Sequence, residues 1–248
     1  MAKKVNKTEE QFAQVESGLT KSAIYIEKNW KLLSIIVGAI ALIIGGYIGY
    51  NNYIVKPNIL AADESLYIAE FYLEQGLKDI KSDNDSIKNL AKQNINFALN
   101  GDGQNIGFLT IANNYSSTKA GNLSQYYAAR CQYELGKYQD ALSLMKKFDT
   151  DDKIFKSISF GFIGDCNIQL GKVDEALENY ESASSEEYKN EITTPRYLMK
   201  QAQVYAQKKN NHCKALDIYN IISLEYNKQK EKLNIQKYIS ESSLRCKK

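Results

Sequence analysis

The sequence predicts an all-α protein: one N-terminal transmembrane helix, then an α-solenoid of about four helical hairpins with a C-terminal capping helix. The first observation is an internal repeat, because LGKYQDAL at Leu135–Leu142 returns 35 residues later as LGKVDEAL at Leu170–Leu177. A fixed period of this length indicates helix–turn–helix units that stack on one another. The second observation is a stretch of 24 residues without charge, Leu32–Val55. The third is the scarcity of helix breakers, with only 2 Pro among 248 residues.

Residues 1–30 form the predicted cytoplasmic tail. They are polar, and their scattered charges surround a weak apolar spacing at Phe12, Val15 and Leu19. Such a segment is expected to be either a short helix or a loosely ordered tail. The segment could bind a partner, but a solvated tail is the preferred interpretation.

Residues 31–55 are the predicted transmembrane helix. The 24 uncharged residues reach about 36 Å as a helix, which exceeds the hydrocarbon core of about 30 Å. Trp30 flanks one end and three tyrosines lie near the other, as in the aromatic belts of membrane proteins. A cleaved signal peptide fits less well, because the run starts late, exceeds an h-region and lacks a small-x-small cleavage site.

The flanking lysines predict the orientation of the span. Six Lys precede it, whereas Lys56 is the only cation in the 20 residues that follow it. Because positive charge stays on the cytoplasmic side, the N-terminus is expected inside the cell and residues 56–248 outside. In a bacterium, the chain would be a single-pass inner-membrane protein with its repeat domain in the periplasm.

Small residues in the span form a candidate packing face. Gly45 and Gly49 have the G-x-x-x-G spacing that lets another helix approach closely. The full candidate face consists of Gly38, Ala41, Gly45 and Gly49. The alternative is that these residues reflect only the general abundance of Gly in membrane helices.

Residues 56–248 are the predicted repeat domain. Pro57 marks the exit from the span, and a short linker is expected before a first helical hairpin at 61–76 and 87–99. Breakers at Asn100–Gly103 indicate a turn rather than a calcium loop, since the alternating carboxylates and the closing Glu are missing. A short helix is expected at 108–115.

Two clear repeats follow. The first has predicted helices at 123–135 and 138–148, and the second has helices around Phe160–Ile168 and Val173–Ala183. Their period and their turn glycines are typical of tetratricopeptide repeats.

The last repeat is imperfect. It is expected to begin at Thr194-Pro195, with Thr194 as the N-cap residue and Pro195 at the first helical position. Asn210 stands where the other repeats have a turn Gly. Residues 233–244 are predicted to form the capping helix that covers the final apolar face of the solenoid.

No catalytic, cofactor or metal site is predicted. The single His, His212, lies in a polar turn without a Cys or acidic partner, and a metal site or a nucleophile–base pair needs more groups than this. No phosphate-binding G-x-x-x-x-G-K-[ST] motif occurs. The net charge of +3 leaves a nearly neutral body, unlike a nucleic-acid-binding surface. Neither an enzyme nor a nucleic-acid-binding protein is expected.

The four Cys form no C-x-x-C pair. Cys131 and Cys166 occupy equivalent positions in successive repeats, and both are expected to be small apolar residues buried between helices. Cys213 and Cys246 would join the last helices if they were oxidised. The sequence leaves this pairing open, because it depends on the distance between the Cα atoms.

The remaining candidate site is a protein-binding groove, since the first helix of each repeat lines the concave face of such solenoids. Spacing from the turn glycines selects the candidate residues Tyr126, Arg130, Tyr133, Asp165 and Ile168. Tyr and Arg are enriched at interface hot spots. A mixed groove of this kind would suit peptides or unfolded segments without strong charge selection. The alternative is that the tyrosines only seal neighbouring helices.

The architecture resembles the YfgM-like tetratricopeptide proteins of bacterial envelopes, and residues 97–142 are similar to their version in Bacteroidota. The similar motifs are A-L-N-G-D-G, G-F, T-K-A-G-N and Y-Y-A before the L-G-K-Y turn, and T-T-P-x-Y-L-M-K at Thr193–Lys200. The resemblance covers residues 30–248. The chain departs from the family in its imperfect last turn and its four Cys.

The resemblance implies an ancillary role beside the Sec translocon, often with a membrane-anchored periplasmic prolyl isomerase, in which emerging proteins are assisted. The expected function is therefore that of a membrane-anchored periplasmic scaffold or holdase, with translocon subunits, a prolyl isomerase or unfolded envelope proteins as partners. The alternative function is a static scaffold that organises an envelope complex through the same groove.

Overall fold

The computed structural model describes residues 7–246 and confirms the all-α fold class. Every regular element in this range is helical, and the one β-bridge pairs Gly101 with Ile106. The chain divides into two compact units, Met1–Asn58 and Ile59–Lys248.

The first unit contains a long helix, α1 (Lys7–Tyr50), and a π-helical turn, η1 (Asn51–Val55). The predicted tail is therefore helical from Lys7 onward, which agrees with the helical alternative and excludes the loosely ordered one for this part, although the helix is continuous with the span rather than short. Side chains 15–28 are exposed, as expected for a solvated segment. The first six residues of the tail lie outside the described range.

The predicted span lies on α1 and η1. Among the described residues, one helix is long and apolar enough to cross a membrane, and its most apolar window has no buried side chain. Leu42 and Ile43, for example, are 79% and 72% exposed. A long row of apolar side chains without protein neighbours suits a lipid environment.

Pro57 is accommodated within helical structure, so the predicted linker is wrong. The next helix, α2 (Lys56–Asp79), follows η1 directly. Pro57 has no amide hydrogen, and in an α-helix its ring would clash with the carbonyl group of Tyr53. A π turn immediately before it, in which Lys56 N–H donates to Asn51 O, widens the helix at this point.

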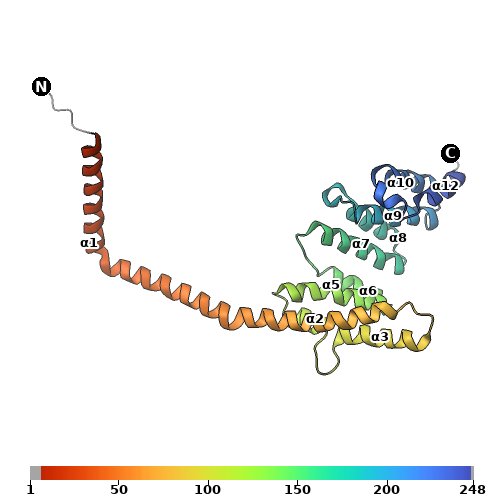
Figure 1. The fold of residues 1–248 in the computed structure, drawn as a ribbon, viewed down its shortest axis with the longest axis horizontal. Coiled ribbons are helices and arrows are strands. Elements are labelled where there is room, and N and C mark those ends of the chain that lie inside the picture. Colours follow the sequence, from red (N-terminus) through yellow and green to blue (C-terminus); the bar gives the residue numbers. More distant parts are fainter. Residues whose placement is uncertain (1–6, 247–248) are drawn as a thin grey trace. The chain divides into compact units, whose positions relative to one another are not determined.

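The second unit is a stack of helical hairpins (Figure 1). The hairpins are α2/α3, α5/α6, α7/α8 and α9/α10, with α4 after the first and α11 and α12 at the end. The bounds are α3 (Asp85–Asn100), α4 (Phe108–Asn114), α5 (Lys119–Glu134), α6 (Tyr138–Met145), α7 (Lys153–Gln169), α8 (Val173–Ala183), η2 (Glu186–Tyr188), α9 (Thr194–Gln207), α10 (His212–Glu225), α11 (Asn227–Lys230) and α12 (Ile235–Arg245). Neighbouring hairpins contact each other through α6 with α7 and α8 with α9. The predicted capping helix is α12, which packs on α10.

The turn glycines end α5 and α7 in the same way. Gly136 and Gly171 have φ values of 78° and 75°. In the first turn, Gly136 N–H donates to Tyr133 O and Lys137 N–H donates to Gln132 O, at 2.9 and 2.8 Å. This is the Schellman arrangement, which satisfies the last carbonyl groups of a helix and favours Gly. Asn210 has a φ of 51° in the corresponding turn, a conformation that Asn tolerates.

A pair of substitutions tests this assignment. Gly136→Ala is expected to lower the free energy of unfolding by about 1 kcal/mol, because Ala would have to adopt a left-handed backbone conformation. Asn210→Gly is expected to be neutral or slightly stabilising, since Gly adopts the same conformation without a Cβ. Chemical denaturation measures both. Equal effects at the two positions would contradict the conformational explanation.

The starts of α5 and α9 differ from the predicted residues in an informative way. The helix α5 begins at Lys119 instead of Leu123, because the Thr118 side chain accepts a hydrogen bond from Gly121 N–H. The N-cap residue of α9 is Thr193, so the prediction of Thr194 is wrong. Thr194 is already helical, and its hydroxyl accepts a hydrogen bond from Asn190 N–H.

The turn predicted at Asn100–Gly103 is confirmed, and Asp102 organises it. One carboxylate oxygen of Asp102 accepts hydrogen bonds from the backbone of Gln104 and Asn105. The other accepts from the Asn105 side chain at 2.9 Å and from the Tyr72 hydroxyl on α2 at 2.7 Å. These donors, the Asn105 backbone amide foremost, hold the pKa of Asp102 well below its usual range.

Acid is therefore expected to weaken the contact between this loop and α2. Because the pKa of Asp102 is lower in the folded chain, its contribution is present above the unfolded pKa near 4 and is lost as the pH falls toward the folded pKa. Asp102→Asn should lower the unfolding midpoint at pH 7, and this difference should shrink below about pH 4. Thermal melts from pH 7 to pH 3 measure it. Asp83→Asn, in the exposed loop before α3, is the control, and an identical pH profile for both variants would refute the assignment.

The cysteines have two different roles. Cys131 and Cys166 are free and fully buried, as predicted. Burial raises the pKa of the Cys166 thiol to about 12, so it stays protonated and unreactive. Cys213 and Cys246 form a disulfide with a Cα–Cα distance of 4.7 Å, which answers the question left open by the sequence.

Candidate functional site

The predicted groove residues lie on the first helices of two hairpins, α5 and α7. Tyr126 contacts the ring of Phe148 with a centroid separation of 5.6 Å, and Tyr133 contacts that of Phe162 at 5.3 Å. Both tyrosines are partly buried against the core between these hairpins. They therefore pack between neighbouring helices, as the alternative interpretation of these tyrosines expects. Part of each side chain nevertheless stays exposed.

Arg130 and Ile168 also make contacts within the domain. Arg130 Nε lies 2.9 Å from Glu134 Oε1, in an ion pair along its own helix. Ile168 is partly buried against the core formed by α8 and α9. The five predicted residues are thus spread over two hairpins, and their role in binding stays a prediction.

Asp165 is the centre of a polar cluster that the sequence did not reveal. It accepts hydrogen bonds from the Tyr180 hydroxyl at 2.7 Å and from Lys200 Nζ at 2.6 Å. Lys200 Nζ also lies 5.8 Å from the ring centre of Tyr180 and 5.7 Å from that of Tyr197, within the range of cation–π contacts. We call Asp165, Tyr180, Tyr197 and Lys200 the Asp165 cluster; it joins α7, α8 and α9.

Two glycines of α7 create the space for this cluster. A Cβ atom at Gly161 would overlap the ring of Tyr197, and one at Gly164 would overlap that of Tyr180. The two rings stack with centroids 6.4 Å apart. The sequence contained one signal for the cluster, because Tyr197 and Lys200 both belong to the T-T-P-x-Y-L-M-K motif.

The electrostatics of the Asp165 cluster keep Tyr180 protonated. Burial, and then the charge of Asp165, raises the pKa of Tyr180 far above its usual range. Tyr180 is therefore a neutral hydrogen-bond donor. The Asp165 and Lys200 side chains are 25% and 33% exposed, so the pair is accessible to a partner although its charges are already matched.

A polar cavity of about 320 Å³ lies between the last helices. Its lining includes His212 on α10, Tyr238 on α12 and the ion pair of Arg245 with Glu241, whose atoms are 3.3 Å apart. His212 Nδ1 is buried without a hydrogen-bond partner. Among the side chains that the structure describes, no group of three or more His, Cys, Asp or Glu is arranged to hold a metal ion. The chemistry expected here is hydrogen bonding to water or to a small polar group.

The candidate packing face of the span is open. Cβ atoms built at Gly38, Gly45 and Gly49 meet no other atom within 4 Å. Ala41 lies on the same helix, α1. The face is thus available to another helix, and its use stays a prediction.

No protein-family model matches the chain, and no curated protein matches it. The class of protein is therefore defined by fold and surface: an α-helical protein of stacked hairpins, with one N-terminal helix able to cross a membrane.

Proposed function

We propose that this chain is a membrane-anchored scaffold or holdase that binds proteins through its helical hairpins on the periplasmic face of a bacterial inner membrane. The main observation behind the proposal is that α1 has a long, exposed apolar stretch and that the same chain continues into a domain of helical hairpins. The lysines before the span support a cytoplasmic N-terminus. The Cys213–Cys246 disulfide supports an oxidising compartment for the hairpin domain.

The proposed partners are unfolded or newly translocated envelope proteins, together with Sec translocon subunits and a periplasmic prolyl isomerase. The resemblance to the YfgM-like proteins supports these partners. Exposed apolar side chains in the second unit support binding of unfolded segments, for example Phe155 on α7 at 41% exposure and Ile192 before α9 at 61%.

Crosslinking in living cells tests the proposal. A photo-activated amino acid at Tyr126 or Tyr133 is expected to capture nascent secreted proteins, and one at Gly45 to capture a membrane partner. The exposed loop position Asp83 is the control. A static scaffold would instead yield one constant set of envelope proteins and no nascent chains. Capture at Gly45 alone would make the membrane helix the recognition element and refute binding by the hairpins.

Thiol labelling tests the compartment. In intact cells, a membrane-impermeant thiol reagent is expected to label Cys246 only after reduction. Labelling without a reductant would contradict the disulfide, and labelling only after permeabilisation of the inner membrane would contradict the orientation.

A further inference from the structure

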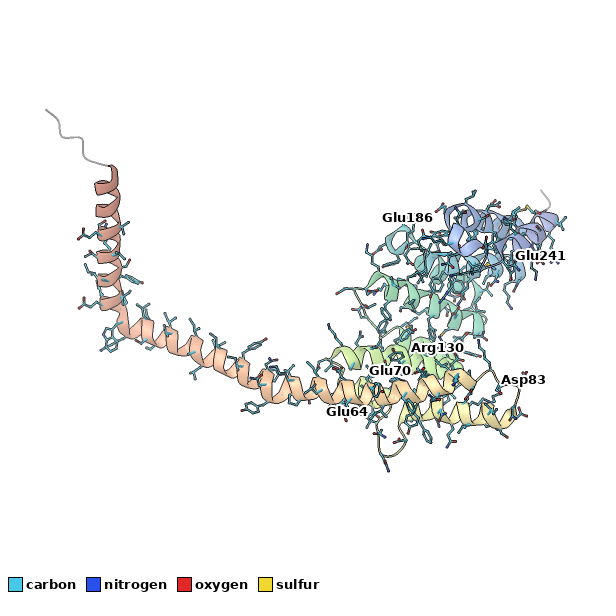
Figure 2. All side chains as sticks on the ribbon, in the orientation of Figure 1. Glu64, Glu70, Asp83, Arg130, Glu186 and Glu241 are labelled. Carbon is cyan, nitrogen blue, oxygen red and sulfur yellow. A yellow bond between two sulfur atoms is a disulfide. The ribbon has the colours of Figure 1, made fainter. Side chains whose placement is uncertain are left out.

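A second, apolar cavity lies between α2 and α5, outside the predicted groove. It has a volume of about 320 Å³ and is lined by Leu73, Leu77, Glu70 and Glu74 of α2 and by Tyr127 of α5. We call it the α2–α5 cleft. Figure 2 shows Glu70 on α2 and Arg130 on the neighbouring α5.

The floor of the α2–α5 cleft is part of the core. Leu73 is 4% exposed, and Leu77 and Tyr127 pack against the same core cluster. The Tyr127 ring stacks on the buried ring of Phe108 with a centroid separation of 5.1 Å. The floor is therefore fixed by packing and offers a preformed apolar surface.

The rim carries negative charge without a matching cation. Burial, and after it the neighbouring Glu70 carboxylate, raises the pKa of Tyr127. Glu74 is exposed and has no ion-pair partner among the described residues. No Lys or Arg lines the cleft, and Arg130 on α5 is paired with Glu134.

Resting on the proposed function, we propose that the α2–α5 cleft binds an extended polypeptide segment with a Leu or Phe side chain flanked by Lys or Arg. The volume of about 320 Å³ is at the lower end for ligand sites, which suits one large side chain rather than a cofactor. The apolar side chain would rest on Leu73, Leu77 and Tyr127. The cation would face Glu70 and Glu74, where charge complementarity selects the segment.

Peptide binding to the full chain in nanodiscs tests this proposal. Three fluorescent peptides serve as probes: GSKLFKSG, the acidic GSELFESG, and GSKSSKSG without the apolar pair. The first is expected to bind about tenfold more tightly than either of the others, because it alone has both determinants. Its affinity should fall with added salt.

A charge reversal on the rim provides the matched comparison. Glu74→Lys is expected to weaken binding of GSKLFKSG about tenfold and to strengthen binding of GSELFESG. Glu64→Lys makes the same charge change on α2 at an exposed position outside the cleft (Figure 2), and should leave both affinities unchanged. Glu74→Gln is the milder second variant, and circular dichroism melts confirm that each variant is folded.

The outcomes separate this proposal from the proposed function. Equal affinity for the three peptides, or equal effects of Glu74→Lys and Glu64→Lys, would overturn the cleft proposal even if Tyr126 captured clients in cells. The expected peptide order and charge reversal, without capture of any protein in cells, would support the cleft and refute the scaffold role.

Discussion

Replacing both Cys213 and Cys246 with Ser is expected to lower the free energy of unfolding by about 3–4 kcal/mol. The disulfide links residues 33 positions apart, and opening a loop of this size returns that amount of chain entropy to the unfolded state. Because stacked hairpins depend on their immediate neighbours, the loss should be concentrated in α10 and α12. Faster hydrogen exchange in these two helices, with little change in α5, would show this.

Reduction provides the control for the disulfide prediction. Dithiothreitol should bring the unchanged chain to the stability of the double Ser variant and leave that variant unaffected. Few other residues hold the capping helix α12 in place, since its buried residues are Ile235 and Ser242. If reduction left both stability and exchange unchanged, packing of these residues would be sufficient to hold α12, and the prediction would be wrong.

Gly161→Ala is expected to lower the free energy of unfolding by about 1–3 kcal/mol, the usual cost of overfilling a core. The sign of this change in the free energy of unfolding is informative, because Gly→Ala at an exposed position within a helix would be stabilising by about 0.5–1 kcal/mol. The new methyl group would overlap the Tyr197 ring, and moving that ring would disturb its contact with Lys200. Chemical denaturation measures the loss.

A double-mutant cycle isolates the cause at Gly161. If the Tyr197 ring is the obstacle, Gly161→Ala should cost much less in a Tyr197→Leu background, because the smaller side chain leaves room for the methyl group. Additive effects of the two substitutions would contradict the proposed overlap.

Local patterns predicted most of the fold. The turns at Gly136 and Gly171 were predictable because a helix end with a left-handed residue depends on a few neighbouring residues. The same reasoning identified the turn at Asn210. It failed at Pro57, where a Pro after a long helix indicated a linker, because the π turn that tolerates this residue leaves no separate sequence signal.

The Asp165 cluster was not predictable, because it depends on how successive hairpins superpose. Asp165 and Lys200 are 35 residues apart, and their side chains meet only because α7 and α9 lie side by side at the matching level. From the sequence, Asp165 was a candidate for partner binding. The sequence could not show that Lys200 already neutralises this charge, because their contact depends on the spacing between the hairpins.

The unequal burial of the four cysteines has a consequence for oxidative maturation. Four thiols can pair in three ways, and the chain emerges from synthesis or translocation with Cys131 and Cys166 ahead of Cys213 and Cys246. If the earlier hairpins form first, both leading thiols are enclosed before the trailing pair is exposed to an oxidant. The order in which the cysteines emerge then selects the Cys213–Cys246 disulfide without the help of a disulfide isomerase.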